Sequence, residues 1–505
     1  MSGENRMNHA SVFQGTAIRR VFEDNWNESF LTDGKSGITF SYKDFMGLVL
    51  GCKQVLDSKG LREGDRLCIF LPNSVELAAL YFTAIAMRLV AVPVDVNRGE
   101  MELNDILPQA CPDAVVCEKK NAGTLSKYGR IVIPVESMRS WRGTGTSAEK
   151  DDLKIFDSID YGALYLITFT SGSTGVPKGV KHSLGNLLAS AAAFRERFGF
   201  GRGDAFYHNL PMTYMAGILN LIILPFISES RIILGERFSI TAVQSFWNVP
   251  SRFGANAFWF VPTEVSLLLK LDRGKDGIEY CTGRRMTACV GTAPLNQKIR
   301  GEFEKKYGMK LYESYGLSET LFVSTVDPGI SEYDCGVGRL LDGVELGFSA
   351  DGEIAISVPW MFLGYTNRMA EDYFADGKYL SGDLGEMDGG FLRITGRKKD
   401  LIIKGGMNIS PRRLEEFILN STDVFNEVVV LGVPDETLGE KVVCFGITGK
   451  TYSTTAVKEL NRRISGMLGR DHQVDEFVIV DDIPKNANGK IDKILLMESY
   501  GKKGK

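Results

Sequence analysis

The segment with the clearest chemical signature is a loop rich in glycine and hydroxyl side chains. The ten residues from Thr170 to Gly179 hold three glycines, four hydroxyls and one lysine. Small residues let backbone N–H groups approach an anion closely, hydroxyls donate further hydrogen bonds, and lysine adds a point charge. This composition suits a polyphosphate. The residues expected to contact it are Thr170, Ser171, Gly172, Ser173, Thr174, Gly175 and Lys178.

The spacing of this loop differs from that of the Walker A motif. Walker A places lysine between glycine and a hydroxyl residue. Here Pro177 precedes Lys178 and Gly179 follows it. A flexible Gly/Ser connection between a strand and a helix is the alternative interpretation, so the segments further along the chain decide between the two.

Four more segments carry polar side chains in a fixed order. They are Tyr315-Gly316-Leu317-Ser318-Glu319, Tyr379-Leu380-Ser381-Gly382-Asp383, Gly396-Arg397-Lys398-Lys399-Asp400 and Pro484-Lys485-Asn486-Ala487-Asn488-Gly489-Lys490. Together with the loop at Thr170 they resemble the signature motifs of the adenylate-forming (AMP-binding) superfamily of acyl-CoA synthetases, peptide-synthetase adenylation domains and luciferases. Because Gly60 to Asn73 and Ala91 to Asp95 resemble its N-terminal portion, the resemblance covers nearly the whole chain.

The resemblance implies a nucleotide site. An aromatic ring at Tyr315 can stack on adenine, with the backbone of Gly291-Thr292-Ala293 against the other face. Asp383 can accept both ribose hydroxyls, and Arg397 can add a donor to the ribose or a phosphate. The other nucleotide-site positions that the resemblance implies are Glu313, Ser314, Gly316 and Ser318.

The expected catalytic residues are Lys490, Glu319 and Thr170. Glu319 offers a hard oxygen ligand for Mg²⁺, which the triphosphate of ATP needs because its negative charges repel an incoming carboxylate. That carboxylate is already ionised at neutral pH, so its adenylation requires cations rather than a general base. Lys490 is the mobile cation that the resemblance implies. Without this context, a lysine after glycine near a C-terminus is a solvated charge.

The implied reaction has two steps. A carboxylic acid and ATP give acyl-AMP and pyrophosphate, and the thiol of coenzyme A (CoA) then displaces AMP. The C-terminal domain is expected to rotate about Lys399, which removes Lys490 and brings in Lys404, Gly405 and Gly406, whose small glycines suit a narrow pantetheine tunnel. There are two alternatives to a CoA ligase. One is a ligase that loads the phosphopantetheine arm of an acyl carrier protein, and the other is a non-enzymatic nucleotide-binding module.

The segment from Pro211 to Gly217 stands where the family lines its acyl pocket, and Tyr214, Met215 and Gly217 are the predicted pocket residues. Met215 falls where amino-acid-activating members hold an aspartate, and a thioether cannot balance a buried ammonium group. An α-amino acid is therefore disfavoured. The apolar residues from Ile218 to Ile222 suggest an apolar acyl or aryl acid, or are simply the core face of a helix.

Four positions depart from the family pattern. Ser318 and Ser381 replace the commoner threonines but keep the hydroxyl. Arg413 replaces a glutamate and Ser228 replaces a glycine, which makes the local geometry there harder to predict.

The elements that must position these residues alternate between strands and helices. Apolar runs at Leu67–Leu71 and Ala163–Phe169 predict strands, while Val75–Met87 and Leu184–Phe194 predict helices, a pattern typical of α/β folds with parallel sheets. Short strands with Gly and Asp turns follow residue 335. The predicted fold is α/β, with a large N-terminal domain of two α/β subdomains plus a β-rich subdomain (1–398), and a small mobile α+β C-terminal domain (399–505).

The length and composition predict a multidomain globular protein. The 505 residues carry 59 basic and 63 acidic side chains, a net charge of -4 that offers no basic field for nucleic acid. Eight cysteines without a C-x-x-C pair and four scattered histidines make a zinc site improbable. The polar N-terminus indicates no signal peptide, and a cytoplasmic location is expected. The apolar stretch from Leu77 to Val94 contains Arg88 and predicts a buried helix and a strand rather than a membrane span.

Overall fold

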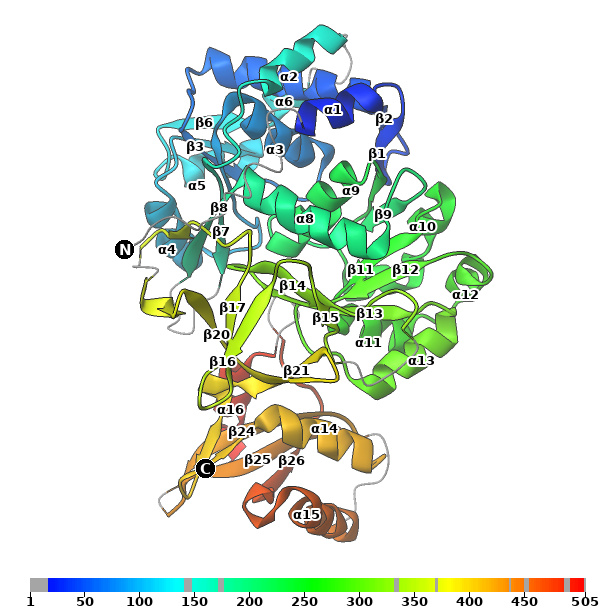
Figure 1. The fold of residues 1–505 in the computed structure, drawn as a ribbon, viewed down its shortest axis with the longest axis vertical. Coiled ribbons are helices and arrows are strands. Elements are labelled where there is room, and N and C mark those ends of the chain that lie inside the picture. The colour runs from blue at the N-terminus through cyan, green and yellow to red at the C-terminus, as the bar shows by residue number, and fades with distance from the viewer. Residues whose placement is uncertain are drawn as a thin grey trace.

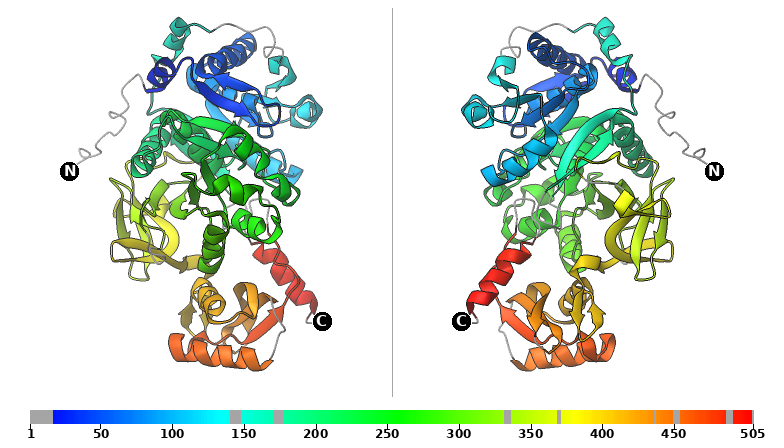
Figure 2. Two further views of the ribbon diagram at one scale, coloured as in Figure 1. Left: turned by 90° about the vertical axis from the view of Figure 1, so that its right-hand side faces the viewer. Right: turned by 90° about the vertical axis from the view of Figure 1, so that its left-hand side faces the viewer.

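The computed structural model describes residues 17–139, 148–170, 177–330, 336–367, 371–435, 437–448, 454–485 and 491–503. The chain forms an elongated molecule in which α1 and α2 lie at one end and the C-terminal strands and α15 at the other (Figure 1). Side views show the same succession of parts along the long axis (Figure 2). The loop residues 171–176 and Lys490 lie outside the described residues.

Two large sheets make up the N-terminal part. The first has the order β18-β8-β7-β4-β3-β5-β6, and β4, β3, β5 and β6 pair in parallel. Its strands are β3 (Arg66–Phe70), β4 (Val90–Pro93), β5 (Ala114–Cys117), β6 (Ile131–Pro134), β7 (Leu164–Thr170), β8 (Lys178–Ser183) and β18 (Gly364–Tyr365).

The second sheet has the order β15-β14-β13-β12-β11-β9-β10-β1-β2, with a parallel centre. Its strands are β1 (Ser29–Asp33), β2 (Thr39–Ser41), β9 (Ala205–His208), β10 (Arg231–Leu234), β11 (Ala257–Phe260), β12 (Thr287–Val290), β13 (Leu311–Leu317), β14 (Leu321–Thr325) and β15 (Arg339–Leu340). Strands of the first and second sheets alternate with helices, as the apolar pattern predicts.

Two smaller sheets follow. The β-rich part has the order β16-β17-β20-β19, with β21 paired to β20, and contains β16 (Glu345–Phe348), β17 (Glu353–Ser357), β19 (Phe374–Ala375), β20 (Lys378–Asp388) and β21 (Phe391–Arg397). The last sheet has the order β23-β22-β25-β24, with β26 paired to β25, and contains β22 (Ile402–Lys404), β23 (Met407–Ile409), β24 (Phe425–Asp435), β25 (Gly439–Thr448) and β26 (Glu476–Ile479).

Helices cover the faces of these sheets. The α-helices are α1 (Ala17–Asp24), α2 (Tyr42–Ser58), α3 (Val75–Met87), α4 (Glu100–Ala110), α5 (Ala122–Leu125), α6 (Glu136–Arg139), α8 (Leu184–Phe198), α9 (Leu224–Ile227), α10 (Asn248–Phe253), α11 (Pro262–Leu271), α12 (Asp276–Cys281), α13 (Gln297–Tyr307), α14 (Pro411–Ser421), α15 (Thr454–Leu468) and α16 (Lys493–Lys503). The described residues also form a π-helix, η4 (Ala216–Ile223). The short 3₁₀ segments are η2 (Lys119–Asn121), η3 (Lys150–Phe156), η5 (Ile240–Ser245), η6 (Glu371–Tyr373), η7 (Lys398–Asp400) and η8 (Arg470–His472).

The helix α3 lies inside the N-terminal core. It begins where the hydroxyl of Ser74 accepts a hydrogen bond from the N–H of Leu77, and it ends at Arg88, which takes a left-handed conformation. The eleven residues from Val75 to Ile85 are all buried, so its apolar surface is covered by protein on every side. Within the described parts of the chain, no helix is long and apolar enough to cross a membrane.

The α/β fold class is confirmed. The bounds of α3 are those predicted, and α8 continues to Phe198, about one turn beyond its predicted end. The expected β-rich segment after residue 335 forms the third sheet. The last sheet begins at Ile402, after the 3₁₀ turn η7 that contains Lys399. The domain division between residues 398 and 399 stays a prediction.

Candidate active site

A cavity of about 920 Å³ opens where β7, β12 and β13 end. The carboxyl ends of parallel strands are the usual place for ligands in α/β folds because the loops that follow them diverge. Many of the residues singled out from the sequence line its wall. They are Thr170, Lys178, Tyr214, Met215, Gly291, Thr292, Ser314, Tyr315, Gly316, Ser318, Glu319, Arg397 and Lys399.

A buried carboxylate organises one end of this cavity. Asp383 is 3% exposed and accepts two hydrogen bonds, one from the hydroxyl of Tyr315 to Oδ2 (2.8 Å) and one from Nε of Arg397 to Oδ1 (2.7 Å). Burial raises the pKa of Tyr315 well above its usual range, so the hydroxyl stays a donor. The side chains predicted to hold adenine and ribose are therefore tied to one another across β13, β20 and β21.

Glu319 and Lys178 meet a cluster of tyrosines. The hydroxyl of Tyr365 donates to Oε1 of Glu319 (2.7 Å) and lies 3.0 Å from the hydroxyl of Tyr379. Lys178 donates to the hydroxyl of Tyr373 (3.1 Å), and its Nζ lies 4.5 Å from the centre of that ring. Sequence reasoning singled out Glu319 and Lys178 but missed two of these tyrosines. Tyr365 is placed by the pairing of β18 with β8, and Tyr373 ends the 3₁₀ segment η6 just before β19.

Among the described residues, no group of three or more His, Cys, Asp or Glu side chains could hold a metal ion. Glu319 is a single hard oxygen donor, and Mg²⁺ is usually held in proteins by one or two carboxylates plus substrate phosphates. Glu319 lines the cavity as Lys178 does, so a carboxylate and a cation face the same space.

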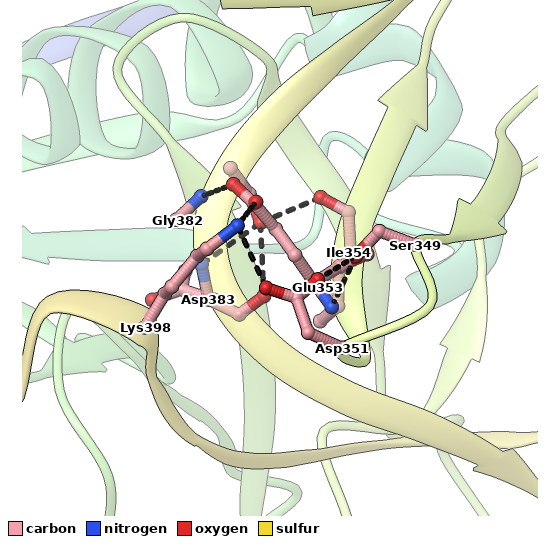
Figure 3. A network of polar contacts seen from close by, with 8 residues as sticks. Ser349, Asp351, Glu353, Ile354, Gly382, Asp383 and Lys398 are labelled. Carbon is pink, nitrogen blue, oxygen red and sulfur yellow. Dashed lines mark hydrogen bonds and ion pairs between the residues drawn. The ribbon is translucent and has the colours of Figure 1, made fainter. Parts of the chain in front are cut away.

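A polar network missed by the sequence analysis supports Asp383 from behind (Figure 3). Glu353 accepts hydrogen bonds from the N–H of Gly382 (3.0 Å) and from Nζ of Lys398 (2.9 Å). The hydroxyl of Ser381 donates to the carbonyl of Ile354 (2.8 Å), so the serine that replaces threonine keeps a hydrogen bond. The network joins β17, β20 and η7, and it fixes the backbone that leads into Asp383.

His182 holds the segment that carries Glu319. Its Nε2 lies 2.6 Å from the carbonyl oxygen of Ser318, which requires Nε2 to carry the proton. Burial lowers the pKa of His182 to about 4, so the ring is neutral near pH 7. A neutral, fully buried histidine here is a positioning group for Ser318 and Glu319.

The other end of the cavity is mainly apolar, and we refer to it as the acyl side. Its residues are Tyr214, Met215, Ala216, Leu219, Asn220, Trp259, Leu321 and Phe322. Tyr214 and Met215 line the cavity, and their role in binding the acyl group stays a prediction. Gly217 does not line the cavity: a Cβ there would overlap the carbonyl oxygen of Pro211, so this glycine allows η4 to pack closely against the preceding loop.

Several predicted site residues lie away from the cavity wall. Glu313 points toward α13, where Nη1 of Arg300 approaches its Oε1 at 3.4 Å, and burial raises its pKa to about 7. Lys404 pairs with Asp475 (2.6 Å) in the last sheet. The remaining ones off the wall are Ala293, beside Thr292, and Gly405 and Gly406, in the turn between β22 and β23. Ser171 to Gly175 and Lys490 lie outside the described residues.

The cavity lies at the ends of parallel strands, the usual place for a ligand site in a protein of the α/β class. A lysine, a carboxylate and a hydrogen-bonded cluster of Asp383, Arg397 and Tyr315 lie at this cavity or its edge. Residues 19–366 match the model of the AMP-binding enzyme family, and residues 413–490 match that of the AMP-binding enzyme C-terminal domain. The chain therefore belongs to the AMP-binding enzyme family.

Similar proteins of known activity are CoA ligases. The chain is 27% identical to the sulfoacetate–CoA ligase of Cupriavidus necator over 87% of this chain and 88% of that protein. It is also 27% identical to the medium-chain fatty-acid–CoA ligase of Escherichia coli, over 87% and 82% respectively. The ATP-bound crystal structure of MatB from Rhodopseudomonas palustris matches its fold with a TM-score of 0.85 at 24% identity, over 97% of this chain and 99% of that one.

Proposed function

We propose that this protein is an AMP-forming acid–thiol ligase, which activates a carboxylic acid with ATP and transfers the acyl group to the thiol of CoA. The observation that carries the proposal is the cluster of Asp383, Tyr315 and Arg397 at the end of a cavity whose other side is apolar. One end suits a nucleoside and the other an acyl chain. Membership of the AMP-binding enzyme family and the named activities of the relatives support it.

In the first half-reaction, an oxygen of the acid attacks the α-phosphate of ATP, and pyrophosphate leaves. Thr170 and Lys178 would bind the phosphates, together with the hydroxyls and glycines from Ser171 to Gly175. Glu319 would hold Mg²⁺, which supplies charge neutralisation to the triphosphate when bound. Lys490 would donate to the oxygen that gains charge. Asp383 would accept the ribose hydroxyls and so align the α-phosphate with the acyl side.

In the second half-reaction, the thiol attacks the acyl carbon of acyl-AMP and AMP leaves with the bond electrons. The proposal places a domain rotation at Lys399, which lies in the turn η7 on the cavity wall. Gly405 and Gly406 lie in the exposed turn between β22 and β23, and the proposal assigns them to a tunnel that must admit pantetheine after the rotation. Buried free cysteines such as Cys68, Cys117 and Cys444 support a reducing compartment, the cytoplasm.

The decisive experiment is exchange of labelled pyrophosphate into ATP over a panel of carboxylic acids. Exchange that depends on one acid class, followed by AMP release when CoA is added, is the expected result. A carrier protein bearing phosphopantetheine should not replace CoA at equal concentration. ATP binding without exchange for any acid would contradict the enzyme assignment and favour a nucleotide-binding module.

A further inference from the structure

A short segment between β9 and η4 forms part of the cavity wall. Thr213, Tyr214 and Met215 line the cavity, together with Ala216 at the start of η4. We refer to these four residues as the wall segment. The backbone of a connecting segment needs hydrogen-bond partners outside regular secondary structure, and these partners decide where the segment lies.

The side chain of Asn73 binds the backbone just before the wall segment. Its Nδ2 donates to the carbonyl of Leu210 (2.7 Å), and its Oδ1 accepts from the N–H of Met212 (2.8 Å). A carboxamide supplies both a donor and an acceptor, so one side chain satisfies two backbone groups. Because Asn73 lies between β3 and α3, these bonds tie a connection of the first sheet to a connection of the second.

Two fully buried side chains hold the same stretch of backbone at further points. The hydroxyl of Tyr81, on α3, donates to the carbonyl of Met212 (2.7 Å). Nε2 of His208, at the end of β9, lies 3.0 Å from the carbonyl oxygen of Gly217, to which it donates. The wall segment is therefore held on one side at Met212 and on the other at Gly217.

Hydrogen bonds inside the stretch pass this placement on to the wall. The N–H of Tyr214 donates to the carbonyl of Pro211 (3.1 Å), and the N–H of Ile218 donates to the carbonyl of Tyr214 (3.0 Å). Pro211 lies between the two residues that Asn73 binds, so a shift of Pro211 displaces Tyr214. None of the anchoring side chains is among the described residues of the cavity wall. Their effect on a ligand therefore passes through the wall segment.

Resting on the proposed ligase function, we infer that Asn73 is a positioning residue for the acid: by fixing the wall segment, it decides which carboxylic acids fit the cavity. Tyr81 acts in the same direction through Met212. A wall held at both ends has one shape and discriminates between acids of different shape, whereas a released wall accommodates several. Misplacement of a positioning group by about 1 Å can lower a rate by about 10²-fold, so small shifts of the wall matter.

The test is acid-dependent exchange of labelled pyrophosphate into ATP, with KM determined separately for the acid and for ATP. The acids are acetate, butyrate, octanoate, succinate, benzoate and phenylacetate. Asn73→Leu, which removes both bonds at similar volume, should raise the KM of the best acid by about 10-fold or more and bring the acids closer together, with the KM for ATP within about 2-fold of the wild-type value. Tyr81→Phe removes one bond and should raise the same KM by about 3-fold.

Asn461 on α15 offers a matched control. Its Nδ2 donates to the carbonyl of Val474 (2.7 Å), and its Oδ1 accepts from the N–H of Val474 (2.9 Å), so the same two kinds of hydrogen bond are made in the C-terminal part, off the cavity wall. Asn461→Leu should leave the KM of every acid unchanged. Thermal unfolding of the Asn73→Leu and Asn461→Leu proteins compares the structural effect of losing the bonds.

The outcomes separate this inference from the ligase function. An unchanged acid profile in Asn73→Leu and Tyr81→Phe, or equal rises in KM for acid and ATP, overturns the inference and leaves the ligase function standing. Tyr81→Phe, which removes a single hydroxyl, decides alone if Asn73→Leu does not fold. Absence of exchange with every acid in the wild-type protein overturns the ligase function, and the inference with it.

Discussion

At the scale of single residues, Asp383 is the group on which the nucleotide end of the cavity depends. Its carboxylate is almost fully buried, and a buried charge is tolerated only when it is paired and hydrogen-bonded. Tyr315 and Arg397 supply these partners, and the backbone behind Asp383 is fixed by the Glu353 network. The carboxylate is therefore held in place before a ribose arrives, which lowers the entropy cost of binding.

We predict that Asp383→Asn weakens ATP binding by about 10- to 100-fold, because the charge-assisted hydrogen bonds to the ribose become neutral ones and the ion pair with Arg397 is lost. Titration calorimetry with ATP measures the change. Asp388→Asn is the matched control, since Asp388 lies on the same strand but is exposed and pairs with Arg393. Equal affinities of the two variants would show that Asp383 has no part in nucleotide binding.

The burial of His182 makes the free energy of unfolding depend on pH. Its folded-state pKa is lowered by burial from 6.5 to about 4. The unfolded chain therefore binds a proton at a higher pH than the folded chain does, and stability is lost as the pH falls from 6.5 to 4. A shift of this size corresponds to about 3 kcal/mol.

The measurement is the free energy of unfolding in urea at several pH values for the wild-type protein and His182→Gln. Glutamine can still donate to the carbonyl of Ser318 but does not titrate. The variant should lose less stability between pH 6.5 and 4. His208, whose pKa is also lowered by burial, contributes equally to both proteins. Parallel curves would mean that His182 is not buried in solution.

At the scale of elements, the π-helix η4 shapes the acyl side. Such helices are rare and occur often at functional sites. Here η4 carries Ala216, Leu219 and Asn220 on the cavity wall, and Gly217 lets it approach Pro211.

We predict that Gly217→Ala destabilises the protein by about 1–3 kcal/mol, because its new methyl group overlaps backbone that must shift. The control is Gly301→Ala on α13, where a Cβ would meet nothing within 4 Å, and it should stabilise by about 0.5–1 kcal/mol. Thermal unfolding of both variants checks the pair. A Gly217→Ala protein as stable as the wild type would contradict the close contact between η4 and Pro211.

Elements with a strong local signal could be predicted from the sequence. The run from Val75 to Met87 is apolar with Ser74 before it, so both the burial and the start of α3 follow from local chemistry. The π-hydrogen bonding of η4 could not be predicted, because its apolar run also fits an α-helix. The glycine turns expected after residue 335 include Gly389 and Gly390, which form the turn before β21.

The residues of the candidate site also divide into those that local sequence predicts and those that only the fold reveals. Tyr315, Glu319 and Asp383 stand in contiguous motifs, and the structure brings these residues to one cavity or its edge. Glu353 stands in an ordinary strand and Asn73 just before a helix, and only contacts with residues far along the chain give them their partners. Their importance is therefore not visible in local sequence.

At the scale of the whole molecule, exposed ion pairs link the N-terminal part to the C-terminal part among the described residues. Lys298 on α13 pairs with Asp423 (3.2 Å), and Lys270 on α11 approaches Glu427 at 3.9 Å. The lysines are half exposed, and such surface pairs contribute only about 0–1 kcal/mol each. The C-terminal part lies at one end of the molecule (Figure 1). Weak contacts of this kind support the proposed rotation about Lys399.

If the C-terminal part alternates between two positions, the two half-reactions must respond separately to variants. Lys490→Ala should slow acyl-AMP formation by about 10²-fold or more, as when one preorganised electrostatic donor is lost, while thioester formation from supplied acyl-AMP and CoA stays near the wild-type rate. Gly406→Leu should have the reverse effect by blocking the thiol tunnel. Pyrophosphate exchange and AMP release measure the two steps.

Matched controls separate these effects from general damage. Lys485→Ala removes a lysine near Lys490 whose Nζ pairs with Glu427 (2.7 Å), and it should spare both steps. Gly390→Leu imposes the same backbone strain as Gly406→Leu, because both glycines have a φ of 85° and open space around them. It should lower stability without blocking the thiol. Equal loss of both half-reactions in Lys490→Ala would exclude alternation about Lys399, since a lysine used in only one position of the domain can affect only the step that occurs there.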